Sequence, residues 1–441
     1  MKLVEDGIYF LGASCPTQKY FEGEIPLTKG MSYNSYLIKD EKTCLLDSAD
    51  ENVIDSFFDN LKEALGDREL DYFVIHHLEP DHTAGITKIL KMYPNVKVFI
   101  SALGLSFLRQ FFRDVKLTNF QLIKEDDQLN LGEHNLTFIA APLVHWPEVM
   151  MSYESKSKIL FSADAFGSFT CFDKLDSSEY EDQEELLYET RRYYTNIVGK
   201  FGDKVQNLLK KAAKFDIQKI CSLHGPIHTK NIPLLMHYYN LWSTYSKEKE
   251  GVLIVYTTIY GHSAVAANYV ENQFKQMCID YDVVNLNKDD FSVSLAKTFI
   301  YDKIILIAPT FNMGLFPKMR EYLEVVADHD VKNKTFAVIE NCSWAPFAKN
   351  CMLKLIEPLK NCTVVPTTLT IKSSLADSDY PVLNQIIQDL DVKTSECKVN
   401  STHQYKCKNC GYIHGGDELK EEFKCPICGE KSFEQIKYLN A

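Results

Sequence analysis

The sequence lacks any apolar run of roughly 18 residues, the length that an α-helix needs to cross a bilayer. Its first residues, Met-Lys-Leu-Val-Glu-Asp, also lack the apolar segment of a secretory signal peptide. Excess positive charge is missing as well, because 60 acidic residues against 48 lysines and arginines leave a net charge of −12. These absences argue against membrane, secreted and nucleic-acid-binding proteins. We therefore expect a cytoplasmic protein whose partners are neither membranes nor nucleic acids.

Two further features are missing or scarce. The glycine-rich fingerprints of dinucleotide-binding and P-loop proteins do not occur. The thirteen cysteines cannot all pair, and nine of them are scattered along the chain. In a reducing compartment we expect those nine to be buried small side chains rather than disulfides. With 441 residues, of which 45% are hydrophobic, the chain is long enough for two or three domains with large cores.

Four side chains that can bind metals follow a short apolar run at Tyr72–Ile75. The apolar run predicts a strand buried on both faces, and Pro80 and Gly85 keep the following segment out of a regular helix. The carboxyl ends of such strands are where open α/β proteins place their chemistry. The four side chains are His77, Glu79, Asp81 and His82.

Three more candidate ligands each follow a strand-like run: His145, Asp164 and His224. Seven candidates at four strand ends are more than one metal can use, so the pattern favours a two-metal site. Any one of these histidines alone would more often be a hydrogen-bonded structural residue. We assign His76 and His228 to that structural class.

The order His-x-Glu-x-Asp-His, followed by His, Asp and His, resembles the metallo-β-lactamase superfamily. The zinc hydrolases of that superfamily carry a histidine where this chain has Glu79. A carboxylate makes the site harder and more anionic, which favours iron or manganese and stabilises higher oxidation states. This variant is the pattern of the flavodiiron proteins (A-type flavoproteins). The resemblance implies that His77, Glu79 and His145 bind one iron, that Asp81, His82 and His224 bind the other, and that Asp164 bridges them, all seven being catalytic.

Residues 1–249 alternate between strand-like and helix-like segments, and we expect an αββα sandwich with the metal site at the edge between two sheets. Apolar spacing predicts a helix at Val53–Leu65. The charged and periodic run Glu179–Phe201 predicts a long helix packed outside the core. Strands are predicted at Ile8–Leu11, Ser35–Ile38, Thr43–Leu46, Lys97–Ile100, Thr137–Ala140 and Ile159–Phe161.

A second domain is predicted after the polar linker Lys247–Gly251. The strand Val252–Tyr256 leads into a hydroxyl-bearing loop and then a helix at Ala264–Phe274, an arrangement that offers backbone N–H groups to a phosphate. A loop of this kind is also often just a helix cap. It resembles the phosphate loop of flavodoxins, which implies FMN contacts at Thr258, Ile259, Tyr260, Gly261, His262 and Ser263.

Two later strand ends strengthen the flavodoxin resemblance. Lys303–Ala308 leads into Pro309–Gly314, similar to the family's Pro-Thr-x-Asn-x-Gly loop, and Thr335–Ile339 leads into Glu340–Ala345. In the latter, Glu340 and Cys342 replace the family's usual Gly and Tyr, whereas Trp344 matches. The implied flavin contacts are Pro309, Thr310, Phe311, Asn312, Gly314, Asn341, Ser343 and Trp344.

The last part of the chain follows a polar tether at residues 392–404 and contains two Cys-x-x-Cys pairs, Cys407 with Cys410 and Cys425 with Cys428. Two such pairs give a tetrahedral thiolate site, for which a zinc ribbon is the alternative to iron. An aromatic residue two positions before each pair and a glycine after it resemble rubredoxin. The spacer of 14 residues between the pairs resembles the shorter rubrerythrin-type domain. A module this small needs its metal to fold.

Together these resemblances imply a metallo-β-lactamase-like diiron domain at 1–249, a flavodoxin-like doubly wound parallel sheet at 250–396 and a short-spacer rubredoxin-like domain at 403–441. They imply reduction of dioxygen to water, of nitric oxide to nitrous oxide, or of both, with electrons passing from the cysteine-bound iron through FMN to the diiron site. In the family, a head-to-tail homodimer, alone or in a dimer of dimers, brings one subunit's flavin to the partner's diiron site. An external NAD(P)H-dependent reductase or electron carrier is expected, because the chain has no dinucleotide fingerprint.

Two alternatives belong to other classes. The first is a zinc-dependent hydrolase of the metallo-β-lactamase superfamily with an accessory flavodoxin-like domain. The second is an electron carrier or redox sensor whose dimetal site is vestigial. Glu79 and the rubredoxin-like cysteines argue against the first alternative, and the complete set of seven ligands argues against the second.

Overall fold

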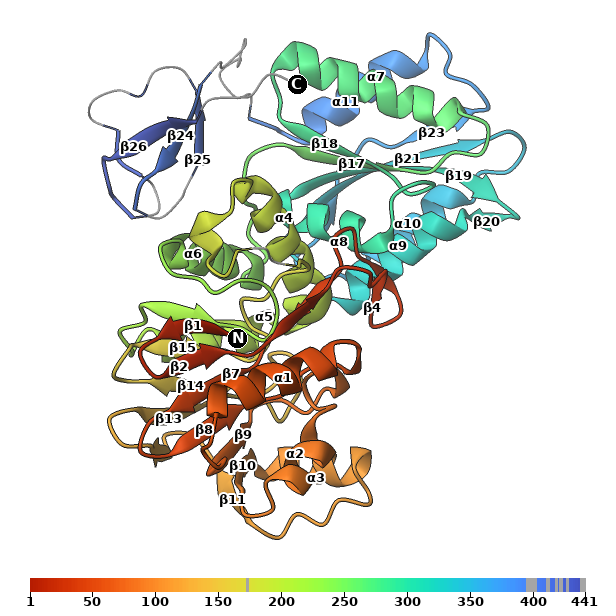
Figure 1. Ribbon diagram of the computed structural model, residues 1–441. Helices are drawn as coiled ribbons and strands as arrows, with labels where there is room; N and C mark the ends of the chain where they lie inside the picture. The colour runs from red at the N-terminus through yellow and green to blue at the C-terminus, as the bar shows by residue number, and fades with distance from the viewer. Residues whose placement is uncertain are drawn as a thin grey trace. The chain divides into compact units, whose positions relative to one another are not determined.

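The structure is a computed structural model that describes residues 1–171, 174–393, 403–409, 413–416, 419, 423–425 and 428–436. Its contacts divide the chain into two compact units (Figure 1). The first is built mainly from Met1–Tyr194 and Asp203–Met236, and the second mainly from Thr195–Gly202 and His237–Lys408. Among the helices of the described residues, none combines the length and the apolar character that crossing a bilayer requires.

Two stacked β-sheets form the centre of the first unit. Helix α1 (Ile54–Leu65) contacts the larger sheet at β7, and α5 (Gly202–Ala212) reaches the smaller sheet where Lys211 Nζ donates to the Ala140 carbonyl at 2.7 Å. This confirms the predicted αββα sandwich. In sheet order, the larger sheet contains β1 (Lys2–Glu5), β2 (Ile8–Phe10), β7 (Tyr36–Lys39), β8 (Thr43–Leu46), β9 (Tyr72–Ile75), β10 (Lys97–Ser101) and β11 (Phe120–Ile123). The smaller sheet contains β12 (Gln128–Asn130), β13 (Asn135–Ala140), β14 (Met150–Glu154), β15 (Ile159–Phe161) and β16 (Lys219–Cys221).

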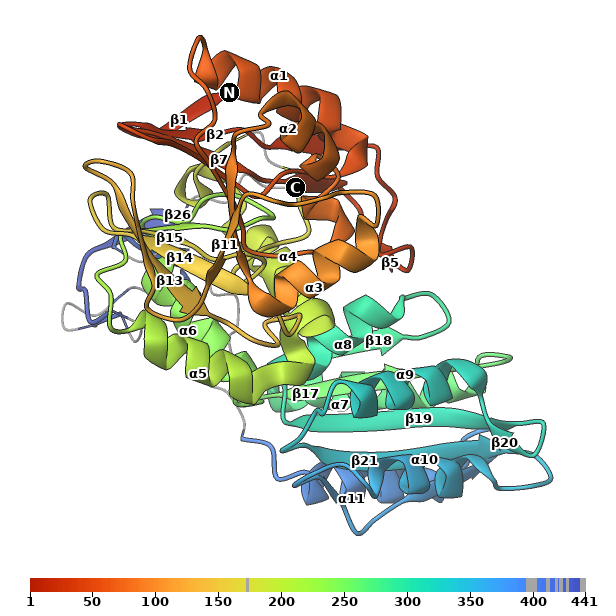
Figure 2. The ribbon, with the colours of Figure 1, turned by 90° about the horizontal axis from the view of Figure 1, so that it is seen from below.

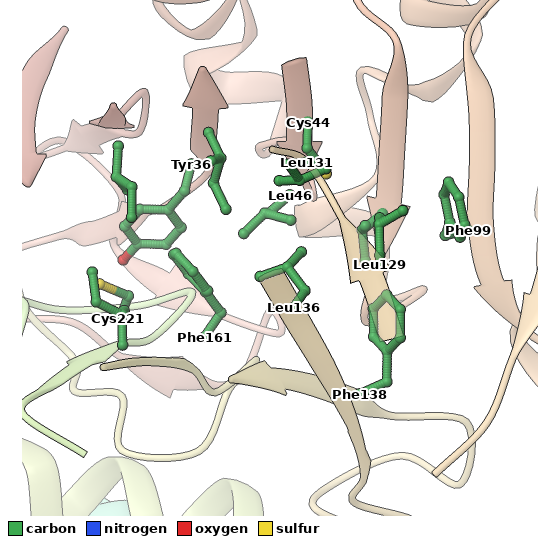
Figure 3. Packing of buried hydrophobic residues seen from close by; sticks show 14 of the residues in the cluster. Tyr36, Cys44, Leu46, Phe99, Leu129, Leu131, Leu136, Phe138, Phe161 and Cys221 are labelled. Carbon is green, nitrogen blue, oxygen red and sulfur yellow. The ribbon is translucent and has the colours of Figure 1, made fainter. Parts of the chain in front are cut away.

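The core of the first unit lies between the two sheets. Figure 3 shows Tyr36 and Leu46 from the larger sheet facing Leu136, Phe138 and Phe161 from the smaller one. Each of these side chains is at most 2% exposed. Since burying one such side chain stabilises a fold by about 1.5–3 kcal/mol, this interface fixes how the sheets stack.

Strands β8, β9, β10 and β11 run parallel, so their carboxyl ends share one edge of the sheet. Phe73 and Val74 in β9 are completely buried and hold the strand in place. Pro80 opens a short 3-10 turn at Pro80–His82, which confirms that the segment after β9 is not a regular helix. Smaller elements around this edge are β3 (Ala13–Cys15), β6 (Met31–Tyr33), the hairpin of β4 (Tyr20–Phe21) and β5 (Ile25–Pro26), α2 (Ile86–Met92) and α3 (Ala102–Phe111).

The prediction of a long outer helix at Glu179–Phe201 is wrong in two respects. The α-helix, α4, spans only Gln183–Tyr193, because Asp182 caps its first turn by accepting from the Glu185 N–H at 2.8 Å. A π-helical segment at Tyr194–Val198 and a 3-10 turn at Gly199–Phe201 follow. The helix also buries charge, since Arg192 is 2% exposed and forms an ion pair of 3.0 Å with Glu189. The many charged residues of this segment therefore led to the wrong prediction that the helix lies outside the core, although one of its faces is buried.

The second unit contains a parallel sheet in the order β18-β17-β19-β21-β22, with β23 continuing beside β21 and β20 pairing with β19. Helices α7 (His262–Met277) and α11 (Asp379–Asp389) cover one face, and α8 (Phe291–Ile300), α9 (Pro317–Asp328) and α10 (Ala348–Ile356) cover the other (Figures 1 and 2). This confirms the doubly wound parallel sheet. The strands are β17 (Val252–Tyr256), β18 (Tyr281–Asn285), β19 (Lys303–Phe311), β20 (Gly314–Leu315), β21 (Thr335–Cys342), β22 (Thr363–Val364) and β23 (Leu369–Lys372).

Two of these strands run further than the sequence predicts. Strand β19 continues through Phe311 rather than ending at Ala308, because Thr310 and Phe311 pair with β20. Strand β21 likewise continues through Cys342 rather than ending at Ile339, because its last four residues pair with β23. The first residues of both predicted flavin loops are therefore held rigidly in the sheet.

The scattered cysteines only partly follow the prediction. Cys44, Cys221 and Cys342 are buried, as expected of small apolar side chains. Cys278 is an exception, because it is disulfide-bonded. At the end of the described chain, β24 (His403–Cys407) pairs with β25 (Ile413–Gly416) on one side and β26 (Phe433–Ile436) on the other, forming a small three-stranded sheet.

Candidate metal and cofactor sites

The seven predicted metal-binding side chains lie together at one edge of the sandwich. His77, Glu79, Asp81 and His82 come from the segment after β9, and His145 and Asp164 follow β13 and β15. His224 follows β16. The ligand atoms form two groups in which all members lie within 4.8 Å of one another. One group contains His77, Glu79, His145 and Asp164, and the other contains Asp81, His82 and His224.

Asp164 lies between the two groups and turns one oxygen to each. Its Oδ2 is 3.2 Å from the Nε2 atoms of both His77 and His145. Its Oδ1 is 3.0 Å from His82 Nε2 and 3.6 Å from His224 Nε2. A carboxylate in this position can bridge two cations.

The remaining carboxylates complete the two groups. Glu79 Oε2 lies 3.1 Å from His77 Nε2 and 3.0 Å from His145 Nε2. Asp81 lies 3.4 Å from His82 Nε2 and 3.3 Å from His224 Nε2. Each group therefore offers two imidazoles, one carboxylate of its own and one oxygen of Asp164, a donor set that suits a pair of iron or manganese ions.

Several of these atoms fit bound metals better than a hydrogen-bonded core. Both oxygens of Asp81, both ring nitrogens of His82, His224 Nε2 and Asp164 Oδ1 are buried and make no hydrogen bond with another described group. Buried polar atoms are rarely left this way, because each costs about 1–3 kcal/mol. A cation between the carboxylates and imidazoles would satisfy all of them except His82 Nδ1, because an imidazole gives one nitrogen to a metal and Nε2 is the one that faces the carboxylates.

In the metal-free chain, the carboxylates keep the imidazoles of His82 and His145 protonated. Burial alone would lower the pKa of His82, but Asp81 and Asp164 raise this pKa to about 9. Burial would also lower the pKa of His145, which its hydrogen bonds to Asp164 and Glu79 raise to about 9. Burial would raise the pKa of the Asp164 carboxyl, but His82 and His77 hold it well below its ordinary value. Metal ions would therefore displace protons from the site.

This charge pattern predicts a pH dependence for the metal-free protein. A histidine whose pKa rises from 6.5 to about 9 on folding stabilises the fold fully below pH 6.5, and the stabilisation is lost as pH rises through about 9. The free energy of unfolding from urea titrations should therefore fall over that interval. Chelated protein with unchanged or rising stability across the interval would contradict the prediction, and iron-loaded protein is the control, because its imidazoles are already deprotonated.

The imidazole rings are oriented by groups that the sequence did not reveal. His77 Nδ1 donates to Glu148 Oε1 at 2.8 Å, and His224 Nδ1 donates to the Ser32 carbonyl at 2.8 Å. Both bonds leave Nε2 free for a metal. Glu148 was missed because it lies in the connection after β13, where no periodic pattern marks it. His76 and His228 are structural as predicted: His76 contacts Asp47 at 2.6 Å, and His228 contacts the Phe166 carbonyl at 3.0 Å.

Aromatic rings surround both groups. The ring centroid of His224 lies 5.5 Å from those of Phe21 and Tyr33. Trp146 lies 5.2 Å from the ring of His77 and 6.2 Å from that of His145. Among the seven ligands, only Glu79, Asp81 and His145 have side chains that are about a tenth exposed. Solvent therefore reaches the site beside these three residues.

A cavity of about 370 Å³ lies at the carboxyl ends of the parallel strands in the second unit. Eleven of the fourteen predicted FMN contacts line it: Thr258, Ile259, Tyr260, His262, Ser263, Pro309, Thr310, Asn312, Asn341, Ser343 and Trp344. Gly261, Phe311 and Gly314 do not line it. Cys342, Ala345 and Ser373 line it and were missed as contacts. Ser373 directly follows β23, a short strand that the sequence did not predict.

The loop before α7 has the geometry of a phosphate site. Thr258 Oγ1 accepts from the Gly261 N–H at 3.0 Å, and Asn287 accepts from the Thr258 N–H at 2.9 Å. Gly261 has a φ of +94°, which disfavours any side chain. His262 and Ser263, the first residues of the sixteen-residue helix α7, line the cavity, where the amino end of the helix and its dipole would hold an anion.

Three of the four clustered cysteines, Cys407, Cys425 and Cys428, come together as a possible metal site. The sulfurs of Cys407 and Cys428 are 3.6 Å apart. Cys410, the fourth predicted ligand, lies outside the described residues. Gly429 has a φ of +71° and donates its N–H to the Cys425 carbonyl at 2.8 Å, so the turn favours glycine.

Comparisons with known proteins agree with this architecture. The family described as ODP family beta lactamase matches residues 31–225, and the rubrerythrin, rubredoxin-like domain matches residues 405–434. The anaerobic nitric oxide reductase flavorubredoxin of Vibrio vulnificus is 28% identical over 347 residues, which cover 77% of this chain and 70% of that protein.

Solved structures share the fold at lower identity. The rubredoxin oxygen:oxidoreductase from Desulfovibrio gigas superposes with a TM-score of 0.83 at 23% identity, covering 88% of this chain and 97% of that one. The flavodiiron protein from Giardia intestinalis gives a TM-score of 0.80 at 21% identity, covering 89% of this chain and 95% of that one.

Fold and sites thus define a class of protein that joins a metallo-β-lactamase-like domain to a flavodoxin-like domain. More particularly, the chain is similar to the anaerobic nitric oxide reductase flavorubredoxins, shares the fold of the flavodiiron proteins and matches a rubredoxin-like domain in its C-terminal part, in agreement with the predicted resemblance.

Proposed function

We propose that this chain is an oxidoreductase that reduces a small diatomic oxidant, dioxygen to water or nitric oxide to nitrous oxide, at a diiron site. The observation that carries the proposal is the placement of Asp164 between two donor groups of equal size, each with two imidazoles and a carboxylate. His77, Glu79 and His145 would hold one iron, and Asp81, His82 and His224 the other. Bound there, the irons would bind the oxidant and supply electrons and Lewis acidity.

The protein groups prepare this chemistry. The carboxylates keep the site anionic, which suits oxidised iron. Ser32 and Glu148 fix the imidazole rings of His224 and His77 so that Nε2 faces the metal position. The partly exposed side chains of Glu79, Asp81 and His145 mark where a small oxidant would reach the otherwise buried site. The zinc hydrolase is not favoured, because a carboxylate, Glu79, stands in the donor set and the chain matches a rubredoxin-like domain.

FMN is proposed for the cavity of the second unit. Its phosphate would bind at the amino end of α7 near Thr258 and Ser263, and its ring would lie between the loops after β19 and β21. Trp344 is 76% exposed at the rim of this cavity. Tyr260 also lines the cavity and is 90% exposed, and this exposed aromatic rim supports a head-to-tail dimer in which the flavin edge of one subunit faces the metal site of its partner.

Electrons are proposed to enter through the iron held by the cysteine cluster and to pass singly through the flavin. The chain has no dinucleotide fingerprint, so a separate NAD(P)H-dependent reductase or carrier would reduce the cysteine-bound iron. Cys410 would complete the four thiolates.

The test is an assay of purified, iron-loaded protein under anaerobic conditions with a reduced electron donor. Consumption of dioxygen and of nitric oxide is measured separately, together with iron and flavin content. Two irons beyond the cysteine-bound one, a yellow flavin spectrum and turnover of either oxidant are expected. Protein that holds zinc in both groups, lacks flavin and consumes neither oxidant would overturn the proposal.

One variant tests the flavin site by itself. Ser263→Asp places a negative charge at the first turn of α7, inside the cavity, where it would repel the FMN phosphate. The purified variant should lose most of its flavin absorbance while keeping its diiron content. Val265→Asp adds the same charge to the same helix at a half-exposed position and is the control. Equal flavin retention in the two variants would contradict the phosphate position.

A further inference from the structure

The two donor groups differ in the charge of the group that accepts a hydrogen bond from the imidazole Nδ1. Glu148 is completely buried and accepts two hydrogen bonds through Oε1, from His77 Nδ1 at 2.8 Å and from the Leu78 N–H at 3.0 Å. Its other oxygen makes no hydrogen bond with a described group. No lysine or arginine of the described residues pairs with this carboxylate, so its charge acts on His77.

Among the described residues, the Asp81 group has no equivalent anion. There, His224 Nδ1 donates to the neutral carbonyl of Ser32, and His82 Nδ1 makes no hydrogen bond with a described group. Two further acids lie near the mouth of the site, Glu22 beside Glu79 and Asp50 toward Asp81. Among the described contacts, no hydrogen bond joins either acid to a ligating imidazole, so neither is equivalent to Glu148.

We propose that Glu148 is a positioning residue that makes the two metal ions inequivalent, so that the ion at His77, Glu79 and His145 keeps the higher oxidation state when the centre is half-reduced. This inference rests on the proposed diiron function. It concerns which ion is oxidised, whereas the proposed function requires only that two irons bind.

The electrostatic reason is direct. A carboxylate that accepts the Nδ1 proton of a ligating imidazole increases the electron density at Nε2 and stabilises the more positive metal ion. The low polarity of a buried site strengthens this effect. One electron from the reduced flavin or from an added reductant converts one of two ferric ions to ferrous. That electron should reach the ion at Asp81, His82 and His224, while the donor loses one electron and no bond is broken.

The informative variant is Glu148→Gln. Its amide oxygen can still accept from His77 Nδ1, so the ring keeps its orientation while the negative charge is lost. In a stepwise anaerobic reductive titration followed by electron paramagnetic resonance, the two one-electron steps of the diiron site should move closer together. The maximum amount of the half-reduced species should then fall below that of the wild-type chain.

Glu154→Gln is the matched control. Glu154 is another fully buried carboxylate of the same unit, 3.2 Å from the imidazole of His134, which is not a proposed ligand. This variant should titrate like the wild-type chain. Glu148→Asp keeps the charge at a shorter reach and should retain most of the wild-type separation between the two steps; a separation lost equally in Glu148→Asp and Glu148→Gln would overturn the role given to the charge.

The outcomes are distinct. A smaller separation in Glu148→Gln than in wild-type and Glu154→Gln protein supports the inference. Equal separations in all three folded proteins, each with two irons, overturn it and leave the proposed function intact. A wild-type chain that cannot hold two irons in this site overturns the proposed function itself.

Discussion

Glu79→His is expected to abolish oxidant reduction while the flavin stays bound. The Glu79 carboxylate lies within 3.1 Å of His77 Nε2 and His145 Nε2, and among the described ligands it is the carboxylate that this donor group does not share with the other. An imidazole in its place would give three neutral nitrogens and one oxygen of Asp164, a set that suits zinc better than oxidised iron. Turnover should fall by more than the roughly 10- to 100-fold that loss of an outer hydrogen-bond partner costs at a metal site.

The measurement combines iron content, flavin absorbance and anaerobic consumption assays for both oxidants. Glu69→His makes the same substitution at an exposed glutamate and should behave like the wild-type chain. Unchanged oxidase activity in Glu79→His would refute the role given to this carboxylate. Because the flavin site lies in the other compact unit, loss of flavin would indicate general misfolding instead.

The strand ends explain why so much of the architecture could be predicted from the sequence. Buried parallel strands are short apolar runs, and a polar side chain directly after such a run has few structural reasons to be there. Strands β9 and β17 begin and end where the sequence predicts, and the polar residues that follow them lie at the metal cluster and the flavin cavity. Four strand ends therefore predicted one cluster of seven side chains.

The features that were missed depend on contacts between distant segments. Glu148 bonds to His77 across 71 positions of sequence, and no local pattern distinguishes it from a surface glutamate. The extra length of β21 depends on β23, a four-residue strand too short to give a clear signal. Arg192 in α4 resembles a solvated charge in sequence, yet its partner Glu189 allows it to be buried.

Asp164→Asn is expected to reduce the iron content of the diiron site from two ions to one or fewer. Asp164 gives one oxygen to each donor group, whereas asparagine has one oxygen and one NH2 group. The NH2 group has no lone pair for a metal and would point its hydrogens at one of the two ions. The loss of charge also removes the anion that lies between the two cations and reduces their repulsion.

Iron analysis of the purified variant measures this loss, with the flavin and the cysteine-bound iron as internal references that should not change. Asp176→Asn is the control, because Asp176 caps a 3-10 turn of the same unit and asparagine caps equally well. Two irons in the diiron site of Asp164→Asn would show that Asp164 does not bridge. The two ions would then be held independently, one by His77, Glu79 and His145 and the other by Asp81, His82 and His224.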